Sequence, residues 1–395
     1  MRCQLHVHVY FTFERNIIVS CPNSRRHTNK YNATPFVLSE SIHLWRVCIM
    51  NGPRIPKNHS TLWHRYVHQR TSLVFVPFPL RLTQEEVFEK LQTDGFAVIP
   101  DVLTTEECDE YAGSYIRWYS NIPKVKQRRS LIQSYRVGHF NSSWKIRLQV
   151  KPVFEMLWGT KKLLTSVDGI AVSAPPEMGN SDFRKDEDCW LHIDQGCKRR
   201  GLHAYQGGVY LEETKEDDYC FRVLKGSHKY HTEFFQSFPN ASDRSLRGDH
   251  EFYRLNPAER AWYAKNGCQH VCVPVPKGGI VLWDSRTVHD SLAPSTTRSN
   301  KDRWRCVCFV SMTPAIWADR SDIEFKQKVY ADLALTTHWS SQGQKRFTDD
   351  KFDDVLSVRR LPQIAKSREA KLMMGVDNYD FHDGKPNGPP APTWE

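Results

Sequence analysis

Two short stretches, far apart in the chain, carry residues that could bind a metal ion. Residues 190–194 read Trp-Leu-His-Ile-Asp and contain His192 and Asp194, and residues 278–289 end on His289. Residues two apart on a β-strand project to the same face, so His192 and Asp194 can offer an imidazole and a carboxylate to one point. A second strand can bring His289 there. Two histidines and one carboxylate on one face of a metal leave the opposite positions open, which is typical of non-haem Fe(II) oxygenases.

The triplet alone is weak evidence, because a lone histidine in an apolar strand is more often a packed core residue than a ligand. The surroundings of His289 strengthen the case. Gly278 and Gly279 predict a tight turn, and the apolar run 280–283 after them predicts a buried strand. A ligating side chain past the end of that strand faces a barrel mouth, where binding sites tend to lie. We therefore predict that His192, Asp194 and His289 are the metal ligands and the catalytic residues.

The next predicted strand, residues 303–312, is rich in β-branched and aromatic residues and places Arg303 and Arg305 on one face. An arginine beside the metal is the expected partner for the carboxylate of an iron-chelating keto acid, because its planar fork binds carboxylates bidentately. The alternative is two solvent-facing arginines on an edge strand, and the metal motif favours the first interpretation. Arg305 is preferred because the unbroken hydrophobic strand begins directly after it, but Arg303 stays open.

Residues 81–375 resemble the phytanoyl-CoA dioxygenase family of Fe(II)/2-oxoglutarate-dependent oxygenases. The matching stretches, in the family's order, are 82–86 with 94–99, 135–139, 192–194, 223–229 and 278–291. The resemblance implies that Arg136 and Ser291 help to hold 2-oxoglutarate, together with Arg305 or Arg303. Family members often place an aromatic residue against the keto acid after the metal pair, but this chain has Gln206-Gly207-Gly208 there. Gln206 is therefore expected to border the cosubstrate.

The fold that this resemblance implies is mainly β with flanking helices, a double-stranded β-helix (jelly-roll, cupin-like) barrel. Helices from residues 81–165 and 315–375 are expected to cover one side. The implied cofactors are Fe(II), 2-oxoglutarate as cosubstrate and O2, and ascorbate stays open as an accessory reductant.

The implied reaction is hydroxylation of a small organic metabolite or acyl derivative, with release of succinate and CO2. The presence of Asp194 favours hydroxylation, since related halogenases lack that carboxylate. Two alternatives remain: a non-catalytic metal- or metabolite-binding relative of the same fold, and a zinc hydrolase with the same ligand set.

The charge of the 395-residue chain is uneven. Residues 1–80 hold ten Lys/Arg and two Asp/Glu, and so carry eight of the ten net positive charges of the chain. They show no clear helical or alternating period, which predicts a basic, poorly ordered N-terminal extension. Residues 81–375 form the predicted oxygenase domain, and the Gly/Pro-rich residues 376–395 an irregular C-terminal tail. The nearly neutral domain predicts a small-molecule substrate and no nucleic-acid partner; the oligomeric state stays open.

The location is expected to be intracellular. No apolar run is long enough to span a bilayer or to form a signal-peptide core, which favours the cytoplasm. The Arg-rich, acid-poor N-terminus leaves a mitochondrial presequence open. The eleven cysteines form no disulfide framework, so reduced thiols are the preferred interpretation. A structural zinc site from Cys268, His270 and Cys272 is a minor alternative.

Overall fold

The computed structural model describes residues 82–123, 125–178, 189–246, 251–295, 297–347 and 358–395, and four short strands between residues 8 and 48. Contacts divide the chain into two units, Met1–Val76 and Pro77–Glu395. In the first unit β1 (His8–Phe11) pairs with β2 (Ile17–Ser20), and β3 (Pro35–Phe36) pairs with β4 (Val47–Cys48). The prediction of poor order for residues 1–80 otherwise lies outside the described residues.

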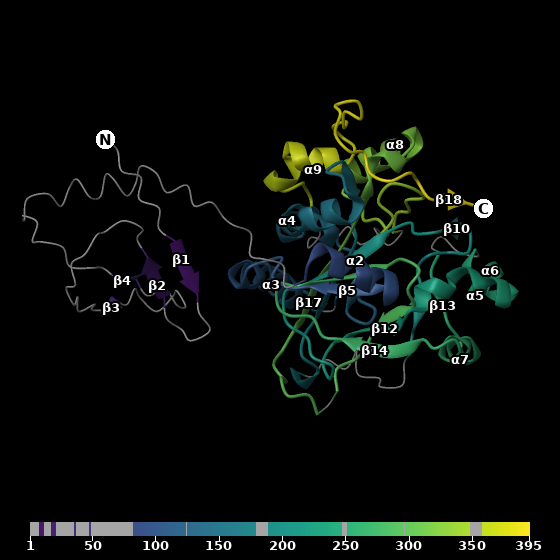
Figure 1. Cartoon of the computed structure of the whole chain (residues 1–395), viewed down its shortest axis with the longest axis horizontal. Coiled ribbons are helices and arrows are strands. Elements are labelled where there is room, and N and C mark those ends of the chain that lie inside the picture. Colours follow the sequence, from purple (N-terminus) through teal and green to yellow (C-terminus); the bar gives the residue numbers. More distant parts are fainter. Residues whose placement is uncertain are drawn as a thin grey trace, which may run out of the picture. The chain divides into compact units, whose positions relative to one another are not determined.

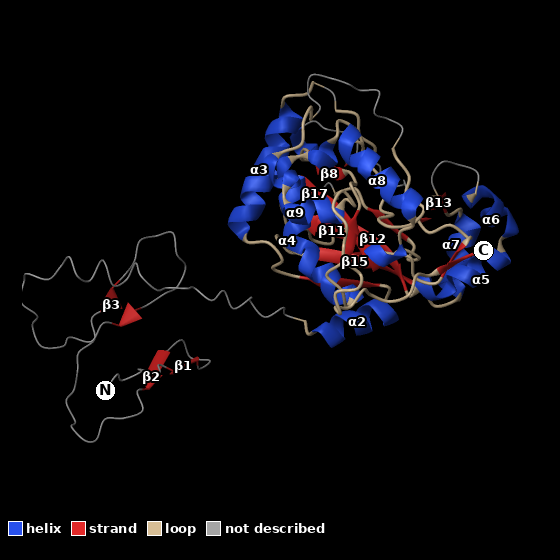
Figure 2. Ribbon diagram, turned by 90° about the horizontal axis from the view of Figure 1, so that it is seen from above, coloured by secondary structure: helices blue, strands red, loops and turns tan. Residues whose placement is uncertain are grey.

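The second unit is built around two antiparallel sheets (Figure 1, Figure 2). The larger sheet has the strand order β5-β15-β11-β17-β8-β6, and β7 also pairs with β17. Its strands are β5 (Phe96–Ile99), β6 (Leu131–Ile132), β7 (Leu163–Thr165), β8 (Ile170–Ser173), β11 (Tyr205–Tyr210), β15 (Ile280–Asp284) and β17 (Arg305–Pro314).

The smaller sheet has the order β13-β9-β16-β12-β14. Its strands are β9 (His192–Ile193), β12 (Phe221–Lys225), β13 (Tyr253–Arg254), β14 (Gln269–Val273) and β16 (His289–Ser291). The inner faces of the two sheets pack on each other, and the rings of Phe221 and Trp283 lie 4.7 Å apart. The sheets are not joined into one closed barrel. This arrangement confirms the predicted double-stranded β-helix fold with flanking helices.

Helices cover the outer face of the larger sheet, as predicted for residues 81–165 and 315–375. They are α2 (Gln84–Thr93), α3 (Thr105–Ser120), α4 (Asn141–Trp158), α8 (Arg320–Asp332) and α9 (Arg368–Met373). Strand β15 shows why both faces are buried. Ile280 and Leu282 join the core under the helices, whereas Val281 and Trp283 point into the space between the sheets. Because successive side chains of a strand point to opposite faces, β15 contributes to both hydrophobic layers.

Local sequence signals fix the helix starts. Thr83 begins α2 with a reciprocal capping box, in which its hydroxyl accepts from the Glu86 amide (3.2 Å) and Glu86 accepts from the Thr83 amide (2.7 Å). Similar boxes start α3, α8 and α7 (Pro257–Lys265). With α5 (His231–Ser237) and α6 (Pro239–Ser245), α7 covers the smaller sheet around Leu191, Ile193 and Leu224.

The start of one strand differs from the sequence prediction. Strand β17 begins at Arg305 instead of residue 303, so Arg303 lies before the strand and does not share its face. Helix α8 ends at Asp332, because Leu333 adopts a left-handed conformation (φ 55°) that ends the helix.

The C-terminal segment packs on the domain. Strand β18 (Thr393–Trp394) pairs with β10 (Arg199–Arg200). Further upstream, Trp317 Nε1 donates to the Pro389 carbonyl (2.8 Å), and Lys162 Nζ lies 2.6 Å from Asp383 Oδ1. Among the described residues, no helix is both long enough and apolar enough to cross a membrane.

We expect deletion of residues 1–78 to leave the second unit folded. The three buried core clusters of the described residues begin at Val87, and the capping box of Thr83 starts the first helix of this unit. The shortened chain should therefore keep its Tm to within about 2 °C, since a larger shift would correspond to about 1 kcal/mol of lost stability. Thermal unfolding followed by circular dichroism measures this. An insoluble product would place the domain boundary further upstream.

Candidate metal centre

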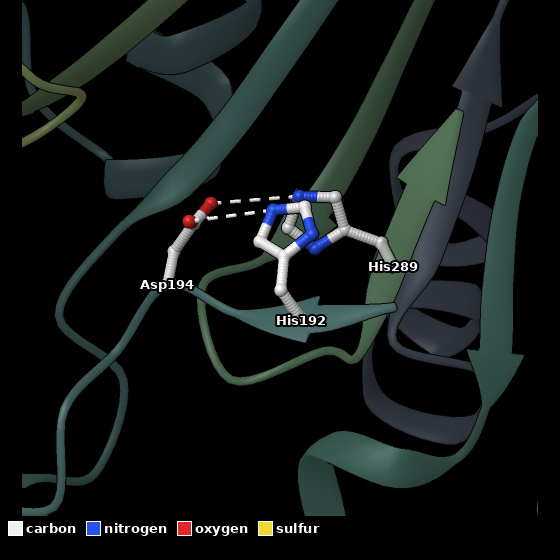
Figure 3. A group of neighbouring side chains, drawn as sticks. All are labelled: His192, Asp194 and His289. Carbon is white, nitrogen blue, oxygen red and sulfur yellow. Dashed lines mark ion pairs between the residues drawn. The ribbon is translucent and has the colours of Figure 1, made fainter. Parts of the chain in front are cut away.

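His192 and His289 face each other across two neighbouring strands. The two residues are register partners in the antiparallel pair β9 and β16, and their rings lie 4.3 Å apart. Asp194 follows directly after β9 and turns its carboxylate toward both rings (Figure 3). His192 Nε2 lies 3.5 Å from Asp194 Oδ1, and His289 Nε2 lies 3.4 Å from Asp194 Oδ2. One ligand atom from each residue lies within 4.8 Å of the other two, so the three groups can meet at a single ion.

Backbone carbonyls fix which ring nitrogen faces that point. His192 Nδ1 lies 3.2 Å from the Trp190 carbonyl, and His289 Nδ1 lies 2.9 Å from the Thr287 carbonyl. A carbonyl only accepts, so each Nδ1 must donate, and in the neutral ring each Nε2 keeps a lone pair. Metal-binding histidines are typically held in this way. The donor set of two imidazole nitrogens and one carboxylate fits Fe(II) and also Zn²⁺.

The protonation states also suit metal binding. Burial, with a smaller effect from His289, lowers the pKa of His192 to about 3, so this imidazole is neutral near pH 7. Burial alone would raise the pKa of Asp194, but the neighbouring histidines and a hydrogen bond from Gln206 lower it below its ordinary value. The Gln206 amide donates to Asp194 Oδ2 at 3.1 Å. Asp194 is therefore ionised and oriented.

The three residues open onto a cavity of about 480 Å³. This volume lies in the range of small-molecule sites. Aromatic side chains form much of the wall: Trp190, Tyr210, Phe221, Phe252, Trp283, Phe309, Trp339 and Phe347. The predicted residues Gln206, Ser291 and Arg305 also line it, and so does Gly208. Gly208 therefore leaves space in the wall.

Arg305 and Ser291 form a pair in the cavity wall. Arg305 Nη2 donates to Ser291 Oγ at 2.9 Å, and Nη1 lies 3.4 Å from the Tyr219 carbonyl. Arg305 is only 3% exposed, although it begins a strand that reaches the cavity. A buried guanidinium beside a hydroxyl is suited to bind a carboxylate.

Arg303 and Arg136, which were predicted to help bind 2-oxoglutarate, are not among the residues that line the cavity. Arg303 precedes β17 and pairs with Glu213 at 2.7 Å. Tyr135 and Arg136 both have φ of 57°, and this turn after β6 sends Arg136 Nη1 to the Val358 carbonyl (3.1 Å). From the same part of the chain, Gln133 and the turn at Arg128 and Arg129 reach the cavity instead.

Two neighbours of the metal centre were not predicted from the sequence. The indole of Trp190 stacks on His192, with ring centroids 4.6 Å apart and planes inclined by 13°. His338 lies with Nδ1 4.0 Å from Asp194 Oδ2. Nothing local in the sequence of residues 336–339, Thr-Thr-His-Trp, connects this stretch to β9 and β16. By contrast, Cys268, His270 and Cys272 form no metal group within the described part of the chain.

Comparison with known proteins agrees with the motifs. The sequence model of the phytanoyl-CoA dioxygenase (PhyH) family matches residues 170–302, which include His192, Asp194, His289 and Ser291. Ava biosynthesis cluster protein O of Aspergillus versicolor is 26% identical over 271 residues, covering 63% of this chain and 84% of the relative. The phytanoyl-CoA dioxygenase domain-containing protein 1 homolog of Caenorhabditis elegans is 21% identical over 258 residues. This match covers 53% of this chain and 86% of the relative.

A solved structure has a related fold. The product of GlcNAc Inducible Gene 2 (GIG2, DUF1479) from Candida albicans aligns with a TM-score of 0.52 at 13% identity, over 78% of this chain and 79% of that chain. This likeness concerns the fold alone. The family match over residues 170–302 confirms the resemblance predicted from the sequence.

We expect the purified chain, loaded anaerobically, to bind about one Fe(II), because the described residues contain one group of three ligands that meets at a point. His192→Ala or Asp194→Ala should remove most of this iron. His382→Ala, at an exposed histidine outside the cavity, serves as the matched control and should retain it. Iron content by colorimetric assay after desalting gives the answer. Full iron content in both ligand variants would contradict the ligand assignment.

Proposed function

We propose that the protein is an Fe(II)/2-oxoglutarate-dependent dioxygenase that hydroxylates a small organic substrate and releases succinate and CO2. The observation that carries the proposal is the pairing of two sites in one cavity. His192, Asp194 and His289 converge on a point suited to Fe(II), and Arg305 with Ser291 lines the same cavity as a carboxylate-binding pair. The family match supports this assignment.

The chain's own residues orient and enclose the reactants. When bound, Fe(II), 2-oxoglutarate and O2 supply the oxidising chemistry, in which the keto acid loses CO2 and one oxygen atom passes to the substrate. Asp194 and the two Nδ1-anchored imidazoles would hold the metal from one side and leave its other side toward the cavity. Arg305 and Ser291 would bind the far carboxylate of 2-oxoglutarate, and the aromatic wall would exclude water.

The zinc hydrolase alternative rests on one observation. Such an enzyme needs a general base, and Asp168 is a carboxyl group in the cavity wall. Burial raises the pKa of Asp168 to about 7, which suits a base near neutral pH. A hydrolase would work with Zn²⁺ and without 2-oxoglutarate, whereas the proposed oxygenase requires the keto acid. A non-catalytic relative is less favoured, because all three metal ligands and the arginine are present.

We expect Arg305→Lys to weaken 2-oxoglutarate binding about tenfold or more, because lysine cannot reproduce a bidentate contact worth about 1.5–3 kcal/mol. Arg303→Lys is the matched control, since Arg303 pairs with Glu213 outside the cavity. The measurement is anaerobic calorimetric titration of 2-oxoglutarate into the Fe(II)-loaded chain. A stronger effect at position 303 would move the role to Arg303, and no binding by the wild-type chain would refute the proposed function.

A further inference from the structure

His338 lies on a segment that is fixed to the larger sheet, although it belongs to no helix or strand. Before it, Thr336 and Val167 exchange two hydrogen bonds. The Thr336 amide donates to the Val167 carbonyl (2.8 Å), and the Val167 amide donates to Thr336 Oγ1 (2.9 Å). After it, Ser340 Oγ donates to the Ser311 carbonyl of β17 at 2.8 Å. The residues on both sides of His338 are buried, whereas His338 is less buried and lines the cavity.

The two ring nitrogens of His338 have different surroundings. Nε2 is enclosed by protein and has no hydrogen-bond partner among the described residues. Nδ1 lies 4.0 Å from Asp194 Oδ2, which is longer than a hydrogen bond. His338 is also not part of the group of three residues whose ligand atoms meet at one point. The Nδ1 edge of the ring therefore lies beside the metal centre without belonging to its ligands.

The charge of Asp194 decides which nitrogen of the neutral His338 ring carries the proton. A neutral imidazole has one N–H donor and one nitrogen with a lone pair. With the proton on Nδ1, the positive end of the N–H dipole faces the carboxylate, whereas a lone pair in that place would be repelled. Nδ1–H is therefore a hydrogen-bond donor at the edge of the metal centre, and the carboxylate that orients it is too far away to accept its hydrogen bond.

Other polar side chains close to this point already have protein partners. The Gln206 amide donates to Asp194 Oδ2 at 3.1 Å. Ser291 Oγ accepts from Arg305 Nη2 at 2.9 Å. Next to the Nδ1 donor the wall is aromatic, and the ring of Trp339 lies 4.3 Å from the imidazole. Sites of this kind hold an apolar body and use a few polar groups to fix its orientation.

We propose that His338 is a substrate-binding residue whose Nδ1–H donates to an uncharged oxygen atom of the substrate, most simply a ketone carbonyl. The aromatic wall holds the ring-bearing body of the same molecule. This inference rests on the proposed function, because it names the substrate class of the same cavity. A carbonyl held by His338 lies beside the metal centre, so this contact selects the carbon atom of the substrate that faces the metal.

Two matched probes test the proposal: 2-acetylnaphthalene, and 2-isopropenylnaphthalene, in which a methylene group replaces the ketone oxygen. Each is titrated anaerobically into the full chain loaded with Fe(II) and 2-oxoglutarate, and binding is followed by calorimetry. The ratio of the two dissociation constants is compared between the wild-type chain and His338→Phe, because this comparison cancels the different hydration of the probes. We expect the preference for the ketone to fall about fivefold in His338→Phe, since the lost hydrogen bond contributes about 1 kcal/mol.

Three further variants separate recognition from folding. His338→Asn should restore most of the preference, because its side-chain amide can place an N–H donor near the position of Nδ1. His382→Phe, at an exposed histidine outside the cavity, is the matched control and should leave the ratio unchanged. If His338→Phe failed to fold, His338→Ala removes the same donor and should lower the preference equally. An unchanged ratio in the folded donor-free variant, or no binding of either probe to the wild-type chain, would overturn the proposal.

Iron content and 2-oxoglutarate affinity, measured for every variant, distinguish failure of this inference from failure of the proposed function. His338→Phe should keep both within about twofold of the wild-type values. Loss of iron would show that His338 positions Asp194, and weaker 2-oxoglutarate binding would assign His338 to the cosubstrate. Either result would overturn the inference and leave the proposed function standing. If the probe ratio depended on His338 in a chain that bound neither iron nor 2-oxoglutarate, the proposed function would fail and the ketone site would stand.

Discussion

The site depends on one repeated hydrogen bond. Each of the two histidines donates from Nδ1 to the carbonyl of the residue two positions before it, Trp190 for His192 and Thr287 for His289. The side chain and the carbonyl lie on the same stretch of chain, so each imidazole is oriented by its own backbone. The antiparallel register then places His192 opposite His289. Strand pairing alone would bring the rings together, but the two Nδ1 bonds decide that both Nε2 atoms face Asp194.

The two-sheet fold supplies the space in front of this centre. Inner-face side chains such as Phe221 and Trp283 pack together at one place, and Gly208 of β11 lines the cavity without a side chain. A side chain at Gly207 would collide with the outer core under α4, since an added Cβ would lie 2.8 Å from Ile280 Cδ1. The two glycines therefore have different structural roles. Gly207 allows the helical layer to pack closely on β11, and Gly208 leaves space in the cavity.

The parts of the site that follow from strand alternation could be predicted from sequence, and the parts that depend on loop direction could not. His192, Asp194, His289, Ser291 and Arg305 lie on or directly beside strands, where a period of two fixes the side-chain direction. Arg136 and Arg303 lie outside strands, and positive φ at Tyr135 and Arg136 reverses the expected direction. His338 and the turn at Arg129 reach the cavity from segments whose positions are set only by tertiary packing.

A buried ion pair holds in place the part of the cavity wall that contains Glu251 and Trp339. Arg199 is 1% exposed, lies between the rings of Trp339 and Trp394 at 3.6 and 4.0 Å, and donates from Nε to both oxygens of Glu251 (2.9 and 2.7 Å). Glu251 and Trp339 line the cavity, whereas Trp394 comes from the C-terminal segment. Removing one partner of a buried ion pair costs about 3–5 kcal/mol, because the other charge is left without compensation. The wall that carries Trp339 and its neighbour His338 is therefore anchored by residues that do not touch the metal centre, and a complete binding site requires the C-terminal segment as well as the two sheets.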